Sequence, residues 1–123
     1  MAQHSTEPKE PQEGKDYHIK GFILNKLCIG GYFCKTGRKH HGKHMSTDDL
    51  PKGYPIEHRG KFPKIIKELK RSGLITIFPA KYGEQVCVSS NPQKLDECLH
   101  LINLYRKAVE LPPLDRRFRE VIS

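Results

Sequence analysis

The chain has 123 residues, enough for one domain with a modest core, and 36% of them are hydrophobic, as in an ordinary globular protein. A formal net charge of +8 indicates an anionic partner such as nucleic acid. The sequence has no run of 18 apolar residues and no charged-then-apolar leader, which argues against a membrane-spanning or exported protein. We therefore expect an intracellular, cytoplasmic protein whose four cysteines are reduced thiols acting as small core hydrophobes.

The first segment, 1–15, is rich in Pro, Glu, Gln and Ser and has almost no aliphatic side chain. It cannot bury enough apolar surface to offset the entropy of ordering it, so we predict a disordered tail. From Asp16 onward, apolar residues recur at helical spacing as far as the Gly30-Gly31 pair, which predicts a first helix ended by glycine.

A loop or loose hairpin is predicted over 32–44, because apolar periodicity stops after Cys34 while Lys, Arg and His accumulate. Three interpretations of this loop remain open. It extends a nucleic-acid surface, or it is a solvated loop, or it belongs to a zinc site. The zinc interpretation is the weakest, because the pattern C-x5-C-x5-H-x3-H lacks the usual close cysteine pair; its ligands would be Cys28, Cys34, His40 and His44.

Ser46 has the features of a helix N-cap, with Asp49 three residues later as the acidic member of a capping box. This pattern predicts a short second helix of about two turns over 46–52, followed by a turn at Gly53-Tyr54-Pro55. A third helix is predicted over 61–72, with Pro63 in its first turn and Gly73 after its end.

The third predicted helix has two faces of opposite chemistry. Wound at 3.6 residues per turn, its apolar side chains fall within an arc of roughly 100°; they are Phe62, Ile65, Ile66 and Leu69. Lys64, Lys67 and Arg71 lie on the opposite side, and Glu68 is the only acid. A face that is merely solvated would intersperse more acids, so we expect this face to meet an anion.

Beyond Gly73 the sequence favours strands, then a last helix. The β-branched runs 74–79 and 85–90, joined by a turn around Gly83, predict a two-stranded hairpin. Asn91 caps a final amphipathic helix over 91–111. We divide the chain into the tail 1–15, a domain over 16–90, the helix 91–111 and a basic tail over 112–123.

This order predicts an α+β fold, mostly α, with a three-helix core, a two-stranded β-hairpin wing and a C-terminal helix. The run S-x-x-D-L-P-K-G-Y-P, the basic helix, G-L-I and the K-x-Y-G turn carry a resemblance over His40 to Val88. On these motifs the chain resembles a group of small, mostly uncharacterised archaeal winged helix-turn-helix proteins. The resemblance implies DNA binding, with the second helix bracing the backbone and the third helix entering the major groove.

The function we expect is binding of double-stranded DNA, as a transcription regulator or chromatin-associated protein, without catalysis or cofactor. Lysines mainly neutralise phosphate, so modest sequence specificity is expected. The hairpin tip extends this surface or is an ordinary solvated turn. The candidate binding residues are Arg38, Lys39, Lys43, Lys52, Arg59, Lys61, Lys64, Lys67, Lys70, Arg71, Lys81 and Tyr82.

Two other functions stay open, an RNA-binding or ribonucleoprotein-associated module and a protein-interaction domain that meets an acidic partner. An enzyme is less favoured, because Cys87 and Cys98 lie on apolar stripes that predict burial and Asp49 is expected to act as a cap. We also find no phosphate-binding Gly-rich loop and no H-E-x-x-H motif in the sequence, and we expect no metal.

A second apolar stripe on the last helix needs a cover; its members are Leu101, Leu104, Ala108 and Leu111. Two covers are compatible with the sequence. The C-terminal tail folds back with its own apolar side chains, Leu114, Phe118, Val121 and Ile122, or a second chain packs there. We favour the homodimer, because helix-turn-helix proteins commonly bind DNA as two-fold pairs.

Overall fold

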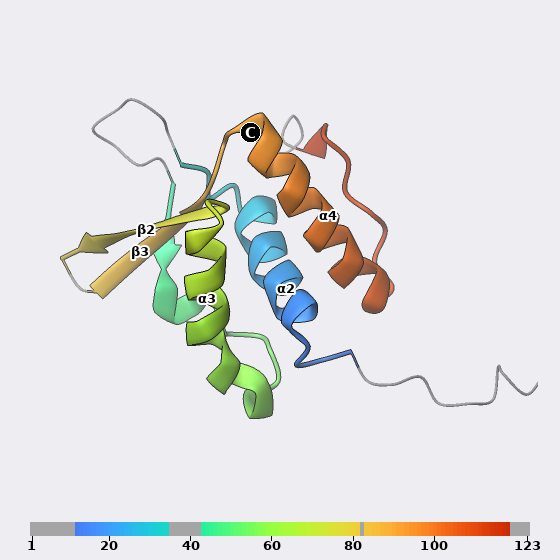
Figure 1. Cartoon of the computed structure of the whole chain (residues 1–123), viewed down its shortest axis with the longest axis horizontal. Coiled ribbons are helices and arrows are strands. Elements are labelled where there is room, and N and C mark those ends of the chain that lie inside the picture. The colour runs from blue at the N-terminus through green and yellow to red at the C-terminus, as the bar shows by residue number, and fades with distance from the viewer. Residues whose placement is uncertain (1–11, 35–42, 82, 119–123) are drawn as a thin grey trace, which may run out of the picture.

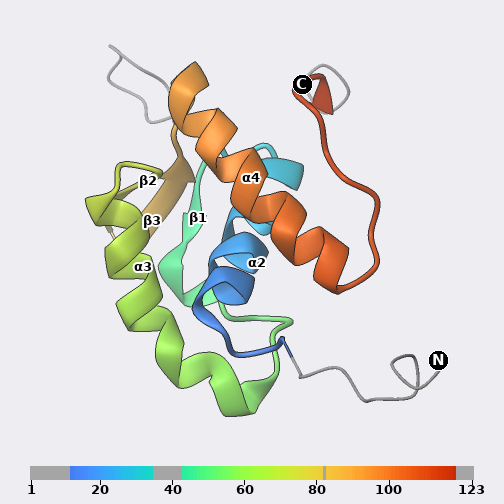
Figure 2. The ribbon, with the colours of Figure 1, turned by 45° about the vertical axis from the view of Figure 1, so that its right-hand side comes forward.

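The computed structural model describes residues 12–34, 43–81 and 83–118. Within these ranges the fold is α+β, as predicted, with three α-helices and a three-stranded antiparallel sheet. Helix α2 (Asp16–Ile29) lies between α3 (Phe62–Arg71) and α4 (Pro92–Ala108), as Figures 1 and 2 show. The sheet packs against α2 and α3, so α2 is the central element of the core.

Helix α2 is buried over most of its circumference, as expected for a central helix. Its buried residues are His18, Ile19, Gly21, Ile23, Leu24, Leu27 and Cys28. Gly21 permits a close approach to α4, because a Cβ there would lie 2.3 Å from the Tyr105 Cβ and 2.6 Å from the Leu101 carbonyl oxygen. A glycine is therefore required where the two helices cross.

The predicted hairpin is present as β2 (Ile75–Ala80) and β3 (Gly83–Val88). Pairing continues to Ala80 opposite Gly83, so the connection has two residues where the sequence predicted five. A third strand, β1 (Met45–Ser46), pairs with β3 and gives the order β1-β3-β2. β1 was not predicted from the sequence, because a two-residue strand leaves no periodic signal.

The prediction of a two-turn helix over 46–52 is wrong. The Ser46 Oγ does accept a hydrogen bond from the Asp48 N–H at 3.2 Å, but only the 3₁₀ turn η1 (Thr47–Asp49) follows. Pro51 has no N–H to extend an α-helical ladder. Asp49 does not complete a capping box but pairs with Lys52 at 2.7 Å. A second 3₁₀ helix, η2 (Ile56–Lys61), leads directly into α3.

Lys26 of α2 binds backbone carbonyls of this segment, which would accept hydrogen bonds from N–H groups if the segment were an α-helix. Its Nζ donates to the backbone carbonyls of Asp49, Leu50 and Lys52. Burial lowers the pKa of Lys26, and the nearby Asp49 carboxylate opposes that effect. The segment before α3 is thus fixed to α2 by one ammonium group.

The N-terminal boundary lies earlier than the sequence predicted. Residues 1–11 of the predicted tail fall outside the described residues, but 12–15 pack on the domain. Gly14 is buried, its N–H donates to the Tyr54 hydroxyl at 2.8 Å, and its carbonyl accepts from the Lys61 Nζ. These contacts are long-range, so a local composition argument could not find them.

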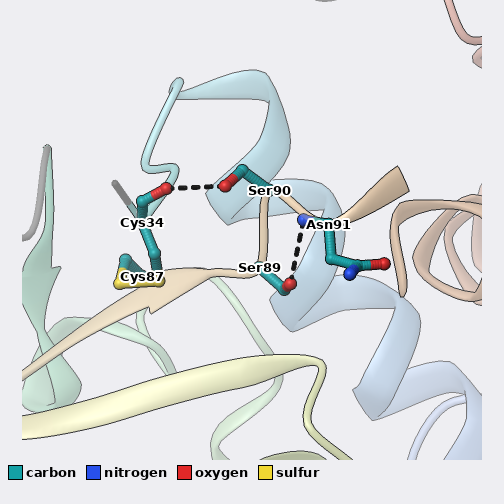
Figure 3. The surroundings of a disulfide bond; sticks show 5 residues. All are labelled: Cys34, Cys87, Ser89, Ser90 and Asn91. Carbon is teal, nitrogen blue, oxygen red and sulfur yellow. Dashed lines mark hydrogen bonds between the residues drawn. A yellow bond between two sulfur atoms is a disulfide. The ribbon is translucent and has the colours of Figure 1, made fainter. Parts of the chain in front are cut away.

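The expectation of four reduced cysteines is wrong for two of them. Cys34 and Cys87 form a disulfide with a Cα–Cα distance of 5.1 Å, shown in Figure 3. The chain after α2 runs beside the end of β3, where the Cys34 N–H donates to the Val88 carbonyl at 2.9 Å and the Ser90 hydroxyl donates to the Cys34 carbonyl. The two cysteines are 53 residues apart in sequence, so no local sequence pattern could predict that they pair. Cys28 and Cys98 are buried thiols, as expected.

We predict that reduction of this disulfide lowers the free energy of unfolding by about 2–4 kcal/mol, since it closes a long loop in the unfolded chain. The measurement is urea unfolding with and without a phosphine reductant. Far-UV circular dichroism should stay unchanged, because backbone hydrogen bonds already hold Cys34 beside Val88. In the double variant Cys34→Ser, Cys87→Ser the reductant should have no effect, and an equal effect there would contradict the assignment.

A buried polar pair lies between α2 and the segment before η2. His18 is 3% exposed, and its Nδ1 shares a hydrogen bond of 2.7 Å with the Tyr54 hydroxyl. The Tyr105 ring packs edge-on against His18. Burial lowers the pKa of His18, Glu13 opposes this effect and His58 adds to it. His18 is therefore neutral in the folded protein at neutral pH.

A lowered folded pKa means that the unfolded chain binds the proton more tightly, so folding stability rises with pH. We predict that the His18 contribution is complete above about pH 6.5, the pKa of an unfolded histidine, and is progressively lost as the pH falls below it. Urea midpoints at pH 7.5 and pH 5 test this. His18→Asn should be less stable at both values but should show a smaller difference between them; an unchanged difference would contradict the prediction.

The C-terminal tail folds back on α4 over the part that the structure describes. Asn103 fixes it with two hydrogen bonds to the Leu114 backbone, at 3.0 Å and 2.8 Å, and Arg116 forms an ion pair with Asp96. Phe118 is buried in the core and packs near Phe33. The described tail thus packs on α4 but leaves Leu104 and Leu111 of the predicted stripe exposed, while Val121 and Ile122 lie outside the described residues.

Candidate nucleic-acid interface

Helix α3 carries the basic face that the sequence predicted. Pro63 occupies its first turn, and the chain ends it in a Schellman motif, with Gly73 at φ 81° and the Leu74 N–H donating to the Leu69 carbonyl at 3.1 Å. Phe62, Ile65 and Leu69 are buried, and Ile66 is partly buried against the core. Core packing on one side therefore fixes which side chains point to solvent.

The single acid of α3 is engaged away from the basic face. Glu68 pairs with Lys20 of α2 at 3.3 Å, and both side chains are about one-third exposed. Because its carboxylate is turned toward α2, it does not neutralise the outward-facing cations of its own helix. Those cations are exposed and make no ion pair with any acid among the residues the structure describes; they are Lys64, Lys67, Lys70 and Arg71.

Other predicted cations are already used in structural contacts. The Arg59 Nε donates to the Tyr54 carbonyl at 2.8 Å, and Lys61 bonds to Gly14 with Asp16 nearby at 3.9 Å. Lys52 pairs with Asp49, whose hydrogen bond raises the pKa of Lys52. Because Lys52, Arg59 and Lys61 already have partners within the protein, they are less available to bind an external anion than the exposed cations of α3.

The loop and hairpin residues of the predicted surface are only partly described. The Lys43 Nζ donates to the Gly30 carbonyl at 2.8 Å and lies 4.7 Å from the centre of the Tyr32 ring. Lys81 is exposed at the hairpin turn. Arg38, Lys39 and Tyr82 lie outside the described residues.

A groove of about 460 Å³ separates α3 from the hairpin and η1. Its lining includes the apolar residues Pro51, Phe62, Pro63, Ile66 and Ile77. The charged residues that line it are of both signs, the cations Arg59, Lys67 and Lys70 and the acids Asp48 and Glu84. An extended anion is therefore favoured on the outer face of α3 and disfavoured within the groove.

The alternative chemistries considered from the sequence find no assembled site in the described residues. The Cys34 sulfur is bonded to Cys87, so it is not a thiolate for zinc, and His40 lies outside the described residues. His44 instead bonds to the Gln85 side chain at 2.9 Å. Over 12–34, 43–81 and 83–118, no group of three His, Cys, Asp or Glu residues has the geometry to hold a metal ion.

Burial raises the pKa of Cys98 to about 12, so this thiol is protonated at neutral pH. The predicted burial of Cys87 and Cys98 is confirmed, although Cys87 is buried as half of a disulfide. Neither sulfur is thus placed to act as a nucleophile in this structure.

Lys20, which engages the one acid of α3, was not among the residues predicted from the sequence. It lies on α2, and only the packing of α2 on α3 brings it to Glu68. The neighbours of Lys20 in sequence gave no signal of this contact, because it joins two different helices.

Comparison of the chain with protein-family models, curated proteins and solved structures finds no match. None of the helices in the described ranges is both long and apolar enough to cross a bilayer.

Proposed function

We propose that this protein binds nucleic acid, with double-stranded DNA as its ligand, through the outer face of α3. The observation that carries the proposal is the separation of charge on α3. Its one acid pairs with Lys20 of α2, while four cations stay exposed along a single helix. Such a helix repels itself unless an anion neutralises it, and a polyanion neutralises all four positions at once.

The dimensions of α3 suit a DNA groove. Ten residues give a helix of about 15 Å, and an α-helix fits the major groove of B-DNA. Its core face is held by buried side chains, so the opposite face is presented rigidly. Lys64, Lys67 and Arg71 point directly away from the core.

The order of elements supports a winged-helix interpretation. A helix, a short strand, a turn, a basic helix and a hairpin follow one another, with the sheet order β1-β3-β2. In this interpretation the first helix of the helix-turn-helix is reduced to the 3₁₀ turn η1, which Lys26 fixes to α2. Helix α3 takes the place of the recognition helix, and the β2–β3 hairpin takes the place of the wing.

Contacts through this face are mainly to phosphate. Three of its four exposed cations are lysines, and Arg71 alone among them has the planar fork suited to a guanine edge. The acids Asp48 and Glu84 in the neighbouring groove direct the phosphate backbone onto α3. We therefore propose a weakly sequence-specific role, in chromatin or in transcription regulation.

We predict that binding to a 25-base-pair duplex, followed by fluorescence anisotropy, depends steeply on salt. Four phosphate contacts give a slope of about −3.6 for log K against log salt. The triple variant Lys64→Gln, Lys67→Gln, Arg71→Gln should bind about 100- to 500-fold more weakly at 0.1 M salt, with a slope near about −0.9. Its thermal stability should be at least that of the parent, because all three side chains are exposed and their neutralisation relieves repulsion along α3.

The matched control keeps the charge and changes the side chains: Lys64→Arg, Lys67→Arg, Arg71→Lys. It should bind about as well as the parent, because phosphate contacts depend mainly on charge. A neutral triple variant with parental affinity would place the binding surface elsewhere. Competition by duplex RNA and by single strands at fixed salt then identifies the polymer, and stronger competition by RNA would replace DNA as the ligand.

A further inference from the structure

Exposed hydrophobic side chains gather where α4 ends. Among the described residues, Leu104 is 39% exposed, Val109 38% and Leu111 43%. Together with Ala108 and the charged Lys107 and Glu110, these residues form a surface that we call the α4 end face. Two other large hydrophobic residues among those described are exposed, Ile29 at 43% and Ile56 at 76%, and they belong to other elements.

The folded-back tail follows a different side of α4. Asn103 directs Leu114 along the helix, and from there the chain runs to the Arg116–Asp96 ion pair and to Phe118 beside Leu95. Figure 2 shows this return path along the outer side of α4. Leu104 projects about 100° around the helix from Asn103 and stays uncovered by the described tail.

The α4 end face combines a hollow with an exposed apolar side chain beside it. The hollow has a volume of about 450 Å³ and is lined by Gln12, Tyr17, Leu104, Lys107, Ala108 and Glu110. Leu111 follows Glu110 directly and is exposed. A patch with a hollow and a neighbouring projection can fit a second copy of itself across a two-fold axis.

The charged residues that line the hollow can also pair with a second copy of the face. Lys107 and Glu110 line it, one of each sign, and neither forms an ion pair with a described residue. A two-fold axis through the face brings Lys107 of each copy toward Glu110 of the other. This complementarity fits a second copy of the chain better than a partner with one sign of charge.

The backbone conformation of Glu110 is a second observation that points to a functional role for this residue. All three helices end in the same Schellman pattern, and the residue in the left-handed conformation is Gly31 after α2 and Gly73 after α3. After α4 it is Glu110, at φ 62°, and the Leu111 N–H donates to the Arg106 carbonyl at 2.7 Å. Glutamate is disfavoured there, and strained residues of this kind concentrate at functional sites.

We propose that the α4 end face binds a second copy of this chain in a two-fold dimer. Leu111 of each copy enters the hollow of the other, and Lys107 and Glu110 pair across the axis. The face is small, so the dimer forms in the micromolar range. This proposal does not depend on nucleic-acid binding, and its test contains no nucleic acid.

The experiment is sedimentation equilibrium of the full chain from about 5 to 500 µM, a range that brackets a micromolar dimer. We expect a reversible rise to the dimer mass in the parent and a monomer throughout for Leu104→Glu, with parental circular dichroism. Leu104 is exposed, so its replacement leaves the core intact. A parent that stays monomeric at the highest concentration, or a Leu104→Glu variant that still dimerises, overturns the proposal.

Exchanging the charges of Lys107 and Glu110 provides a second test of the dimer, which does not depend on the Leu104→Glu variant. Lys107→Glu and Glu110→Lys alone each place like charges across the axis and should weaken the dimer about fivefold or more, while the double exchange restores it. Failure of the double exchange to restore the parental constant rules out this arrangement of the two copies.

Glu110→Gly separates the backbone role of this position from its role in the dimer. Glycine relieves the left-handed conformation, so the melting temperature of the dilute monomer should rise by about 2–5 °C. The same variant loses the carboxylate, so its dimer should be weaker than that of the parent. A variant that is more stable and dimerises equally well would show that Glu110 takes no part in the contact.

Discussion

The backbones of α2 and α4 approach each other at Gly21, and the positions of the other elements depend on this contact. A side chain there would collide with Tyr105 and with the backbone of Leu101, so the crossing of the two helices tolerates only glycine. Because α2 is apolar over most of its surface, the area that α4 leaves open has to be covered by α3 and by the sheet. The packing of α3 on α2 thus determines the direction in which the cations of α3 point.

Helix α2 also sets the electrostatics of its neighbours. Lys20 engages the one acid of α3, and Lys26 satisfies three carbonyls of the segment that precedes it. Both lysines are partly buried, and they reach from different sides of α2 to adjacent elements. Because Lys20 binds Glu68, no acid of α3 neutralises the exposed cations of that helix. Lys26 supplies hydrogen bonds to carbonyls of the segment before α3, which forms a 3₁₀ turn instead of an α-helix. Charge on the central helix therefore shapes the candidate interface without being part of it.

Local sequence signals predicted the elements with strong periodicity and clear end signals. The Gly30-Gly31 pair, Gly73 and the Asn91 cap place the limits of α2, α3 and the start of α4 within a residue or so, because capping depends on neighbouring residues alone. The failures share a different cause. The β1 strand, the Cys34–Cys87 bond, the packing of Gly14 and the Lys20–Glu68 pair all join residues that are distant in sequence. The cations of α3 were found from the helix period, but which of the other cations are already engaged depended on tertiary contacts that no period encodes.

The anchoring of Gly14 defines the smallest fragment of this chain that should fold. Its amide and its carbonyl are both used, by Tyr54 and by Lys61, and Tyr54 in turn holds His18. Limited proteolysis that trims the chain as far as Gln12 leaves this set of bonds whole. Cleavage four residues later, at the start of α2, would remove a partner from the Tyr54 hydroxyl and from the Lys61 ammonium group at the entrance to α3. The boundary that matters for autonomous folding is therefore set by a side-chain hydroxyl 40 residues away and not by the first residue of the helix.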